Sequence, residues 1–412
     1  MGSMNFQGVI GQKAIQQQLV NMVQQNRLSH AILLIGPEGS GVLPLAIGFG
    51  QFVVSYPQQK KAPPKVADLF GGMSALPTED EEIQGDQFPG FDQKALELIH
   101  PDLHFSYPVI KRGSDSNTPP ISADWAVEWR EFIKKHPYGN LFDWLQFIKA
   151  ENKQGNITAR ECNEIIHKIS LKPYESRYKV LVMWMPEMLG ESGNKLLKLI
   201  EEPPPDTLFI FAAENVERIL PTILSRCQLV KIPPMTTGDI AQALVEQKGL
   251  DEQKALQIAL VSDGNLHDAL ELLQHHEDNW NGILRDWLNA TLMRGAAGSN
   301  PYANLNKVVT ELSSLGREKQ KQLLQYFLQL IEQSLRIRLM GTTNLNLPEQ
   351  EAEFALRLNK IAGPGTLAAL ARVLEDGTYY VERNANPKLL FHSLSIKMRE
   401  ILNNKQLIGT LP

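Results

Sequence analysis

The chain has 412 residues, of which 43% are hydrophobic and 21% are charged, which excludes a disordered or fibrous protein and indicates about two to four globular domains. Its net charge of -5 excludes DNA binding by bulk positive charge, so any contact with DNA must be local or shared with partners. The two cysteines, Cys162 and Cys227, argue against a disulfide framework and exclude a four-cysteine zinc site. Without a long apolar run or a basic region leading into one, we expect a cytoplasmic protein.

Helical and strand patterns alternate over the first half of the chain. An amphipathic stretch at residues 15–23 precedes an apolar run at 31–35 that stops at Gly36, which predicts a helix, a buried strand and a glycine loop. Apolar runs at 178–184 and 207–212 predict two more buried strands, with a helix between them. This alternation predicts an α/β domain with a parallel sheet between helical layers.

Two insertions interrupt this pattern, at about residues 56–99 and 110–156. The first is rich in proline, glutamine, lysine and acidic residues and contains no cysteine, so we expect a surface segment. The second contains a helix that Ser122 is expected to cap, with Trp125, Trp129 and Phe132 on one face. These aromatic side chains would suit a docking or base-stacking surface, but at helical spacing packing is favoured.

Beyond two prolines at 233–234 the patterns are helical throughout. We expect an α/β domain at residues 4–235, a small helical domain at 236–279 and a second helical domain at 280–412. The last of these carries a long apolar stripe from Leu323 to Leu335, which needs a partner helix inside or outside the chain.

The segment from Gly36 to Leu43 reads GPEGSGVL and follows a predicted strand, where a phosphate-binding loop GxxxxGK[ST] belongs. Gly36 and Gly41 keep the spacing, and Gly39 helps to leave backbone amides available to phosphate. Val42 replaces the lysine and Leu43 the hydroxyl, and neither residue can neutralise phosphate or ligate magnesium. We therefore predict a degenerate loop without ATP hydrolysis, metal or other cofactor, and residual ATP binding stays open.

Several segments together resemble the AAA+ clamp-loader subunits of bacterial DNA polymerase III. They are VIGQ at 9–12, RLSHA at 27–31, HPDLH at 100–104, SLKPY at 170–174, NKLLKLIEEPP at 194–204 and NANPKLL at 384–390. The resemblance implies an AAA+ P-loop-type sheet domain, a helical lid domain and a helical C-terminal collar domain that holds the subunits together. Many relatives carry a four-cysteine zinc module ahead of HPDL, which this chain lacks.

The same resemblance implies that further parts of the ATPase are altered. Trp184 and Met185 stand where the family has Asp-Glu, which orders magnesium and activates water. Ala212 stands where a polar sensor is expected, and His267 stands where active relatives have an arginine in the lid.

In contrast, the signature Ser225-Arg226-Cys227 is intact. In the family its arginine reaches the γ-phosphate held by the neighbouring subunit, as an arginine finger, and a guanidinium suits this because it binds phosphate oxygens bidentately. The alternative is that Arg226 caps a helix or pairs with a carboxylate. Cys227 has no indicated base, so we interpret it as a packing residue.

A lost nucleotide site beside an intact finger resembles the delta-prime class of subunit. The resemblance implies a non-hydrolysing member of the polymerase III holoenzyme, with clamp-loader ATPase subunits and delta as partners and with sliding clamp and primer-template DNA reached through the complex. Two alternatives stay open. An active clamp-loader-like ATPase would need a lysine and an acid supplied from elsewhere, and a DNA-binding or interaction module on a recycled AAA+ fold would need a basic face.

Overall fold

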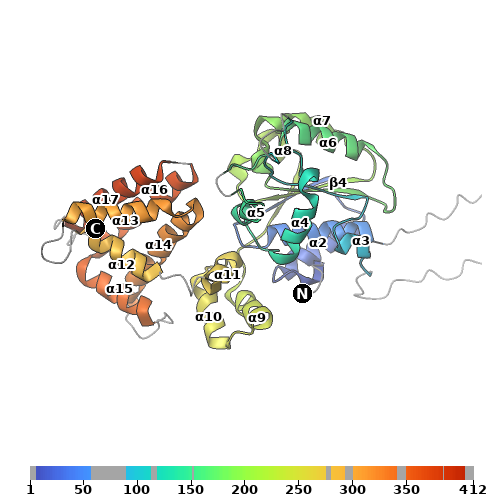
Figure 1. Ribbon diagram of the computed structural model, residues 1–412. Coiled ribbons are helices and arrows are strands. Elements are labelled where there is room, and N and C mark those ends of the chain that lie inside the picture. The colour runs from blue at the N-terminus through green and yellow to red at the C-terminus, as the bar shows by residue number, and fades with distance from the viewer. Residues whose placement is uncertain are drawn as a thin grey trace, which may run out of the picture. The chain divides into compact units, whose positions relative to one another are not determined.

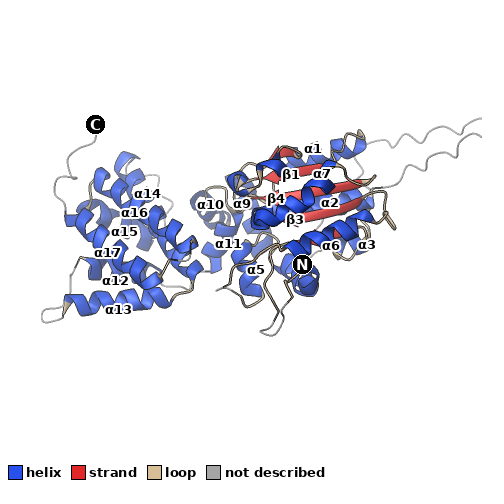
Figure 2. Cartoon of the chain, turned by 90° about the horizontal axis from the view of Figure 1, so that it is seen from above, coloured by secondary structure: helices blue, strands red, loops and turns tan. Residues whose placement is uncertain are grey.

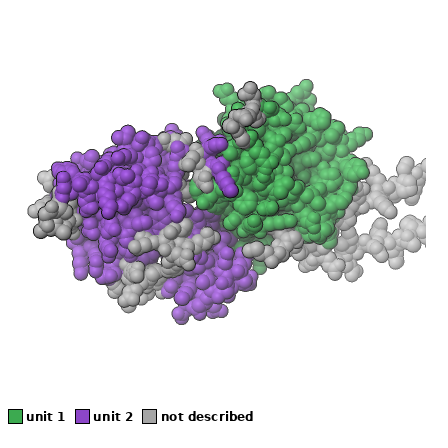
Figure 3. All heavy atoms as spheres, in the orientation of Figure 1, with its two compact units in different colours: residues 1–148, 155–236 green, residues 149–154, 237–412 purple. Residues whose placement is uncertain are grey.

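The computed structural model describes residues 6–56, 90–112, 118–150, 153–274, 280–292, 300–340, 349–383 and 385–403. The chain forms two compact units, residues 1–148 with 155–236 and residues 149–154 with 237–412 (Figure 3). Most of the expected first insertion, residues 57–89, lies outside the described residues.

The first unit, coloured from blue to green in Figure 1, is built on a parallel sheet with the strand order β2-β3-β4-β1-β5. Its strands are β1 (Ala31–Ile35), β2 (Leu103–Ser106), β3 (Lys179–Trp184), β4 (Thr207–Ala213) and β5 (Gln228–Lys231). Its helices are η1 (Phe6–Gly8), α1 (Lys13–Gln24), α2 (Val42–Ser55), α3 (Gln93–Leu96), η2 (Ser122–Trp125), α4 (Ala126–Lys135), α5 (Leu141–Phe147), α6 (Ala159–Ser170), η3 (Pro186–Leu196), α7 (Leu197–Glu201), η4 (Val216–Arg218) and α8 (Pro221–Leu224). The expected parallel sheet domain, followed by helical regions, is confirmed.

Helical layers cover both faces of the sheet, which explains why β1, β3 and β4 are unbroken apolar runs (Figure 2). On one face Leu33 and Phe209 share a core with Cys162 and Ile165 of α6. On the other face α2 approaches closely, because a Cβ on Gly50 would lie only 3.1 Å from Val182. Cys162 and Cys227 are free cysteines and form no disulfide bond with each other.

The strand order fixes where a ligand would bind. β1 lies between β4 and β5, and β3 lies on the far side of β4, so the chain reverses its direction of winding next to β1. In open parallel sheets ligands bind at such a switch point, outside the carboxyl ends of the strands. Ile35 pairs with Ala213 and Trp184 with Ala212, so three strand ends meet there.

The second insertion leaves and rejoins the α/β fold at one point, where Val109 and Asn156 exchange two backbone hydrogen bonds of 3.1 Å. The three aromatic side chains predicted on one helical face, Trp125, Trp129 and Phe132, are buried, as the packing interpretation predicts. Trp129 stacks on Tyr107 with a centroid distance of 4.0 Å and meets Trp144 edge-on at 5.3 Å. The insertion therefore adds a core of its own to the sheet domain.

The expectation that Ser122 caps this helix is wrong. Its hydroxyl instead accepts a hydrogen bond from the backbone N–H of Tyr107 at 3.0 Å and lies 3.1 Å from the carbonyl oxygen of the same residue. Ser122 thus fastens the insertion to the chain that leaves β2. A serine ahead of an apolar stripe carries the same sequence signal for either role, so only the fold separates them.

The second unit is helical. It contains α9 (Thr237–Lys248), α10 (Glu252–Val261), α11 (Leu266–Gln274), α12 (Trp280–Thr291), α13 (Pro301–Ser314), α14 (Arg317–Met340), α15 (Glu349–Ile361), α16 (Pro364–Glu382) and α17 (Pro387–Asn403). The predicted stripe on α14 finds its partner inside the chain, because Leu324 and Phe327 share a buried core with Leu370 of α16 and Phe391 of α17. None of the described helices combines the length and apolar character that a membrane crossing needs.

Asp102 of the HPDLH segment holds the loop that leads into β3. Its Oδ1 accepts the backbone N–H of Tyr174 at 2.7 Å, and its Oδ2 accepts those of Glu175 at 2.7 Å and Ser176 at 2.8 Å. Burial acts to raise the pKa of Asp102, but the three N–H donors outweigh it and leave the pKa below its usual value.

We expect Asp102→Asn to lower the free energy of unfolding at pH 7 by about 2 kcal/mol, because an amide replaces a charged acceptor of three hydrogen bonds. Because the folded pKa is lowered, the stabilisation is present above the unfolded pKa and is lost as the pH falls through the folded pKa. Urea unfolding of parent and variant between pH 7 and acid pH should therefore show a difference that shrinks with acid. A constant difference would contradict this account.

Candidate nucleotide pocket and Arg226

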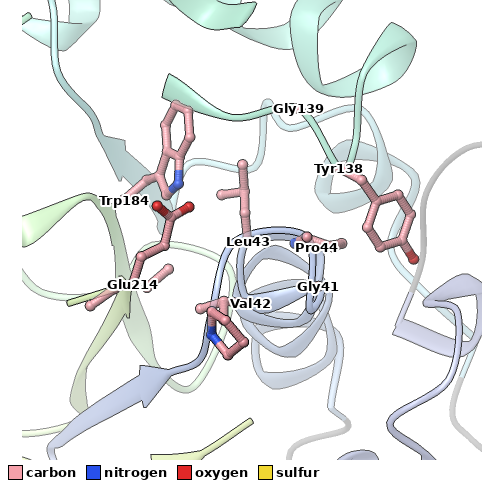
Figure 4. Close-up of a pocket in the computed structure, with 12 residues that line it drawn as sticks. Gly41, Val42, Leu43, Pro44, Tyr138, Gly139, Trp184 and Glu214 are labelled. Carbon is pink, nitrogen blue, oxygen red and sulfur yellow. The ribbon is translucent and has the colours of Figure 1, made fainter. Parts of the chain in front are cut away.

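A small pocket lies where the carboxyl ends of β1, β3 and β4 meet the glycine loop (Figure 4). Its wall is made of Pro37, Gly39, Gly41, Val42, Leu43, Pro44, Tyr138, Gly139, Trp184, Ala212, Ala213 and Glu214. The structure thus brings together most of the residues predicted for the degenerate phosphate site. Gly36 stands apart from this wall, packed so tightly that a Cβ would lie 2.6 Å from the carbonyl oxygen of Ile232.

The backbone of the loop keeps the form that the glycines predict. Gly39 and Gly41 have φ angles of 72° and 89°, in the left-handed region that favours glycine, and α2 begins at the next residue. The side chains that follow are apolar and buried, with Val42 6% and Leu43 5% exposed. The loop therefore has a phosphate-binding shape without the charge or the hydroxyl that phosphate and magnesium require.

The end of β3 contributes an aromatic ring where an acid is expected. Trp184 lies with its ring centroid 5.4 Å from that of Trp129 and 6.3 Å from that of Phe132. Figure 4 shows Trp184 and Glu214 on one side of the pocket and Tyr138 on the other, with Leu43 between them. Glu214 is the acidic residue of this wall, but no lysine or arginine of the wall accompanies it.

The pocket is too small for a nucleotide in this conformation. Its volume is about 20 Å³, which is room for roughly one water molecule. Pockets that hold drug-sized ligands measure roughly 300 Å³ or more. Val42, Leu43 and Trp184 line this space together with Tyr138 and Gly139 from the second insertion.

Glu187 shapes the turn that follows β4, a role that the sequence did not suggest. Its Oε1 accepts the backbone N–H groups of Glu214 at 2.7 Å and Asn215 at 2.8 Å. Burial raises the pKa of Glu187, and these hydrogen bonds oppose the rise. The residue therefore fixes one wall of the pocket from behind. The only sequence signal for it is an acid two residues after the altered Asp-Glu pair.

Arg226 does not line this pocket. It follows α8, and its Nη2 lies 2.6 Å from Oε1 of Glu201, in the EEPP part of the family-like motif. Nη1 donates to the carbonyl oxygen of Thr222 at 2.8 Å and to Oγ of Ser225 at 3.1 Å. The ion pair with Glu201 and the hydrogen bond to Thr222 at the end of α8 are what the alternative interpretation of Arg226 predicts, and 29% of the side chain is exposed.

Two other residues singled out in the sequence, Cys227 and His267, do not line the pocket. Cys227 is half-buried, and burial raises the pKa of its thiol to about 12, which is unfavourable for a nucleophile and agrees with packing. His267 is buried in α11 of the second unit, with Nδ1 3.6 Å from Oδ1 of Asp268 and Nε2 3.9 Å from Oε1 of Glu271.

Comparison with known proteins agrees in part with the resemblance. Residues 130–236 match the family described as DNA polymerase III, delta subunit. Over 178 residues the chain is 39% identical to the DNA polymerase III subunit gamma of Buchnera aphidicola subsp. Schizaphis graminum, covering 41% of this chain and 48% of the relative. Over 175 residues it is 30% identical to the subunit tau of Bacillus subtilis, covering 41% of this chain and 30% of the relative.

The chain therefore spans half or less of the length of these curated relatives. A solved structure, the Bacillus subtilis DNA clamp loader delta protein, aligns with 94% of this chain and 99% of its own at 11% identity and a TM-score of 0.31. The names of these relatives are gamma, tau and delta, and none is delta-prime. The similarities support a relationship to the clamp-loader subunits of DNA polymerase III, of the gamma, tau and delta type, without singling out one subunit.

Proposed function

We propose that this chain is a non-hydrolysing subunit of a bacterial DNA polymerase III clamp loader, of the delta-prime kind. In this role it supports the loading of the sliding clamp onto primed DNA during replication in the cytoplasm. It joins ATPase subunits and a delta subunit, and Arg226 acts on the nucleotide of a neighbour as an arginine finger.

The main observation behind this proposal is the composition and size of the pocket. The site that AAA+ proteins use for nucleotide has Val42, Leu43 and Trp184 in place of its catalytic groups, and its volume is about 20 Å³. Arg226 lies elsewhere, with its guanidinium ordered at the surface of the same unit. A chain that has lost its own chemistry and kept the residue that serves a neighbour fits a supporting subunit better than an autonomous enzyme.

An active ATPase is the competing function, and the similarity to gamma and tau subunits favours it. We expect the pure protein to show no ATP turnover above background, because no wall residue of the pocket supplies the lysine, and its single acid, Glu214, does not replace the hydroxyl ligand. Phosphate release by the pure chain, with the matching ATPase subunit as the positive control, measures this. Turnover that survives further purification and is lost in Glu214→Gln would establish the competing function.

Assembly is tested by co-purification of the chain with the matching clamp-loader ATPase and delta subunits. The proposal requires one discrete complex that contains this chain. An interaction module acting outside the loader would leave those subunits unbound, so its elution apart from them at micromolar concentration would reject the proposed role.

A further inference from the structure

The turn at residues 136–140, between α4 and α5 of the second insertion, lies against the glycine loop. The hydroxyl of Tyr138 accepts a hydrogen bond of 2.7 Å from the backbone N–H of Ile10, 128 residues away. Its ring lies beside Gly41, where a Cβ would come within 3.4 Å of Cε1. The side-chain amide of Asn140 donates to Oε1 of Glu38, inside the glycine loop, at 2.8 Å.

The turn is held rigidly from both sides. Asn140 caps α5, since its Oδ1 accepts the N–H of Asp143 at 2.9 Å and its own N–H donates to Oδ2 of Asp143 at 3.1 Å. Gly139 has no room for a side chain, because a Cβ would lie 2.8 Å from Cζ of Phe132. The position of Tyr138 is therefore set by the packing of α4 and α5.

Of these two helices α4 packs directly on Trp184, and α5 packs on α4. The rings of Trp129 and Phe132 on α4 pack on Trp184, and Trp144 of α5 packs edge-on against Trp129. The residue that replaces the magnesium-organising acid thus supports the helices that carry the turn. Trp184 and the turn are therefore parts of one packed arrangement.

We propose that residues 136–140 are a built-in occupant of the degenerate nucleotide site. Tyr138 connects the N-terminal segment to the glycine loop, and Asn140 holds that loop through Glu38, as a bound ligand would. The loop then keeps one conformation whether or not ATP is present. This role rests on the proposed identification of the pocket as a degenerate nucleotide site, but it does not depend on membership of a clamp loader.

A fluorescent ATP analogue with magnesium tests the occupancy on the full chain. We expect no saturable binding by the parent, and little by Val42→Lys/Leu43→Thr, which restores the loop residues but leaves the turn in place. Adding Tyr138→Ala to that pair should tighten binding at least tenfold. Equal affinity of the double and triple variants, or tight binding by the parent, would overturn the proposal.

Amide exchange gives a second measurement that does not depend on the restored loop. Tyr138→Phe removes only the hydroxyl, so exchange of the Ile10 amide should accelerate several-fold. Tyr107→Phe is the matched control, because its buried hydroxyl donates to the carbonyl oxygen of Ser122 at 2.7 Å. Unchanged Ile10 exchange in Tyr138→Phe, or the same acceleration in the control, would show that the turn does not hold the site.

Discussion

Arg226→Ala is expected to lower ATP turnover at the neighbouring interface by roughly a thousandfold, which is the effect of removing an arginine finger from a phosphoryl-transfer site. The variant should still fold and assemble, because its ion pair with Glu201 is partly exposed and such pairs contribute about 1 kcal/mol or less. The measurement is steady-state ATP turnover of the reconstituted loader with primed DNA and clamp. The total rate should fall less than the rate at this interface, because other subunits hydrolyse through interfaces of their own.

Three variants distinguish a role of Arg226 as an arginine finger from a purely structural role. Arg226→Lys should restore little activity, because an ammonium keeps the charge but loses the bidentate fork. Arg218→Ala, which removes an exposed arginine of η4 in the same unit, should leave turnover unchanged. Glu201→Gln releases the guanidinium without removing it, so it should retain most of the turnover. Normal turnover in Arg226→Ala, with assembly intact, would leave Arg226 as the partner of Glu201 and nothing more.

The sheet and the glycine loop could be predicted because their signals are local. The apolar run at 31–35 coincides with β1, and the runs at 178–184 and 207–212 differ from β3 and β4 by one residue. A strand buried on both faces needs an unbroken apolar run, and a left-handed backbone favours glycine, so both features are present in the sequence itself. The replacement of the expected lysine, hydroxyl and acid by Val42, Leu43 and Trp184 is likewise visible in the sequence itself.

What could not be predicted depends on contacts between distant segments. Nothing near Tyr138 indicates that its hydroxyl meets Ile10, since the sequence around it has the composition of an ordinary turn between helices. The apolar stripe on α14 predicts a partner helix but cannot tell an internal partner from another subunit. Both answers come from packing, which local patterns do not encode.

Because the apolar stripe on α14 is buried inside the second unit, an assembly surface would have to lie on the outside of this unit. Its α17 exposes two aliphatic side chains seven residues apart and therefore on one helical face, Leu389 with 71% and Ile396 with 56% exposed. Tyr379 and Tyr380 of α16 are also exposed, at 48% each. Exposed apolar side chains gathered on neighbouring helices are typical of protein–protein contacts.

The double variant Leu389→Asp/Ile396→Asp is therefore expected to weaken assembly with the partner subunits about a thousandfold, since the loss of an anchor residue at the centre of an interface costs about 2 kcal/mol or more and two anchors are lost. It should stay folded, because neither side chain is part of the core. Leu256→Asp/Leu260→Asp on α10 is the matched control, with 44% and 47% exposure in the same unit, and it should assemble like the parent. Size-exclusion chromatography with light scattering, at concentrations spanning the dissociation constant of the parent complex, distinguishes the two pairs.

Normal assembly of the α17 variant would place the contact elsewhere. Equal failure of both pairs would mean that charge on this unit, rather than the α17 face, controls assembly.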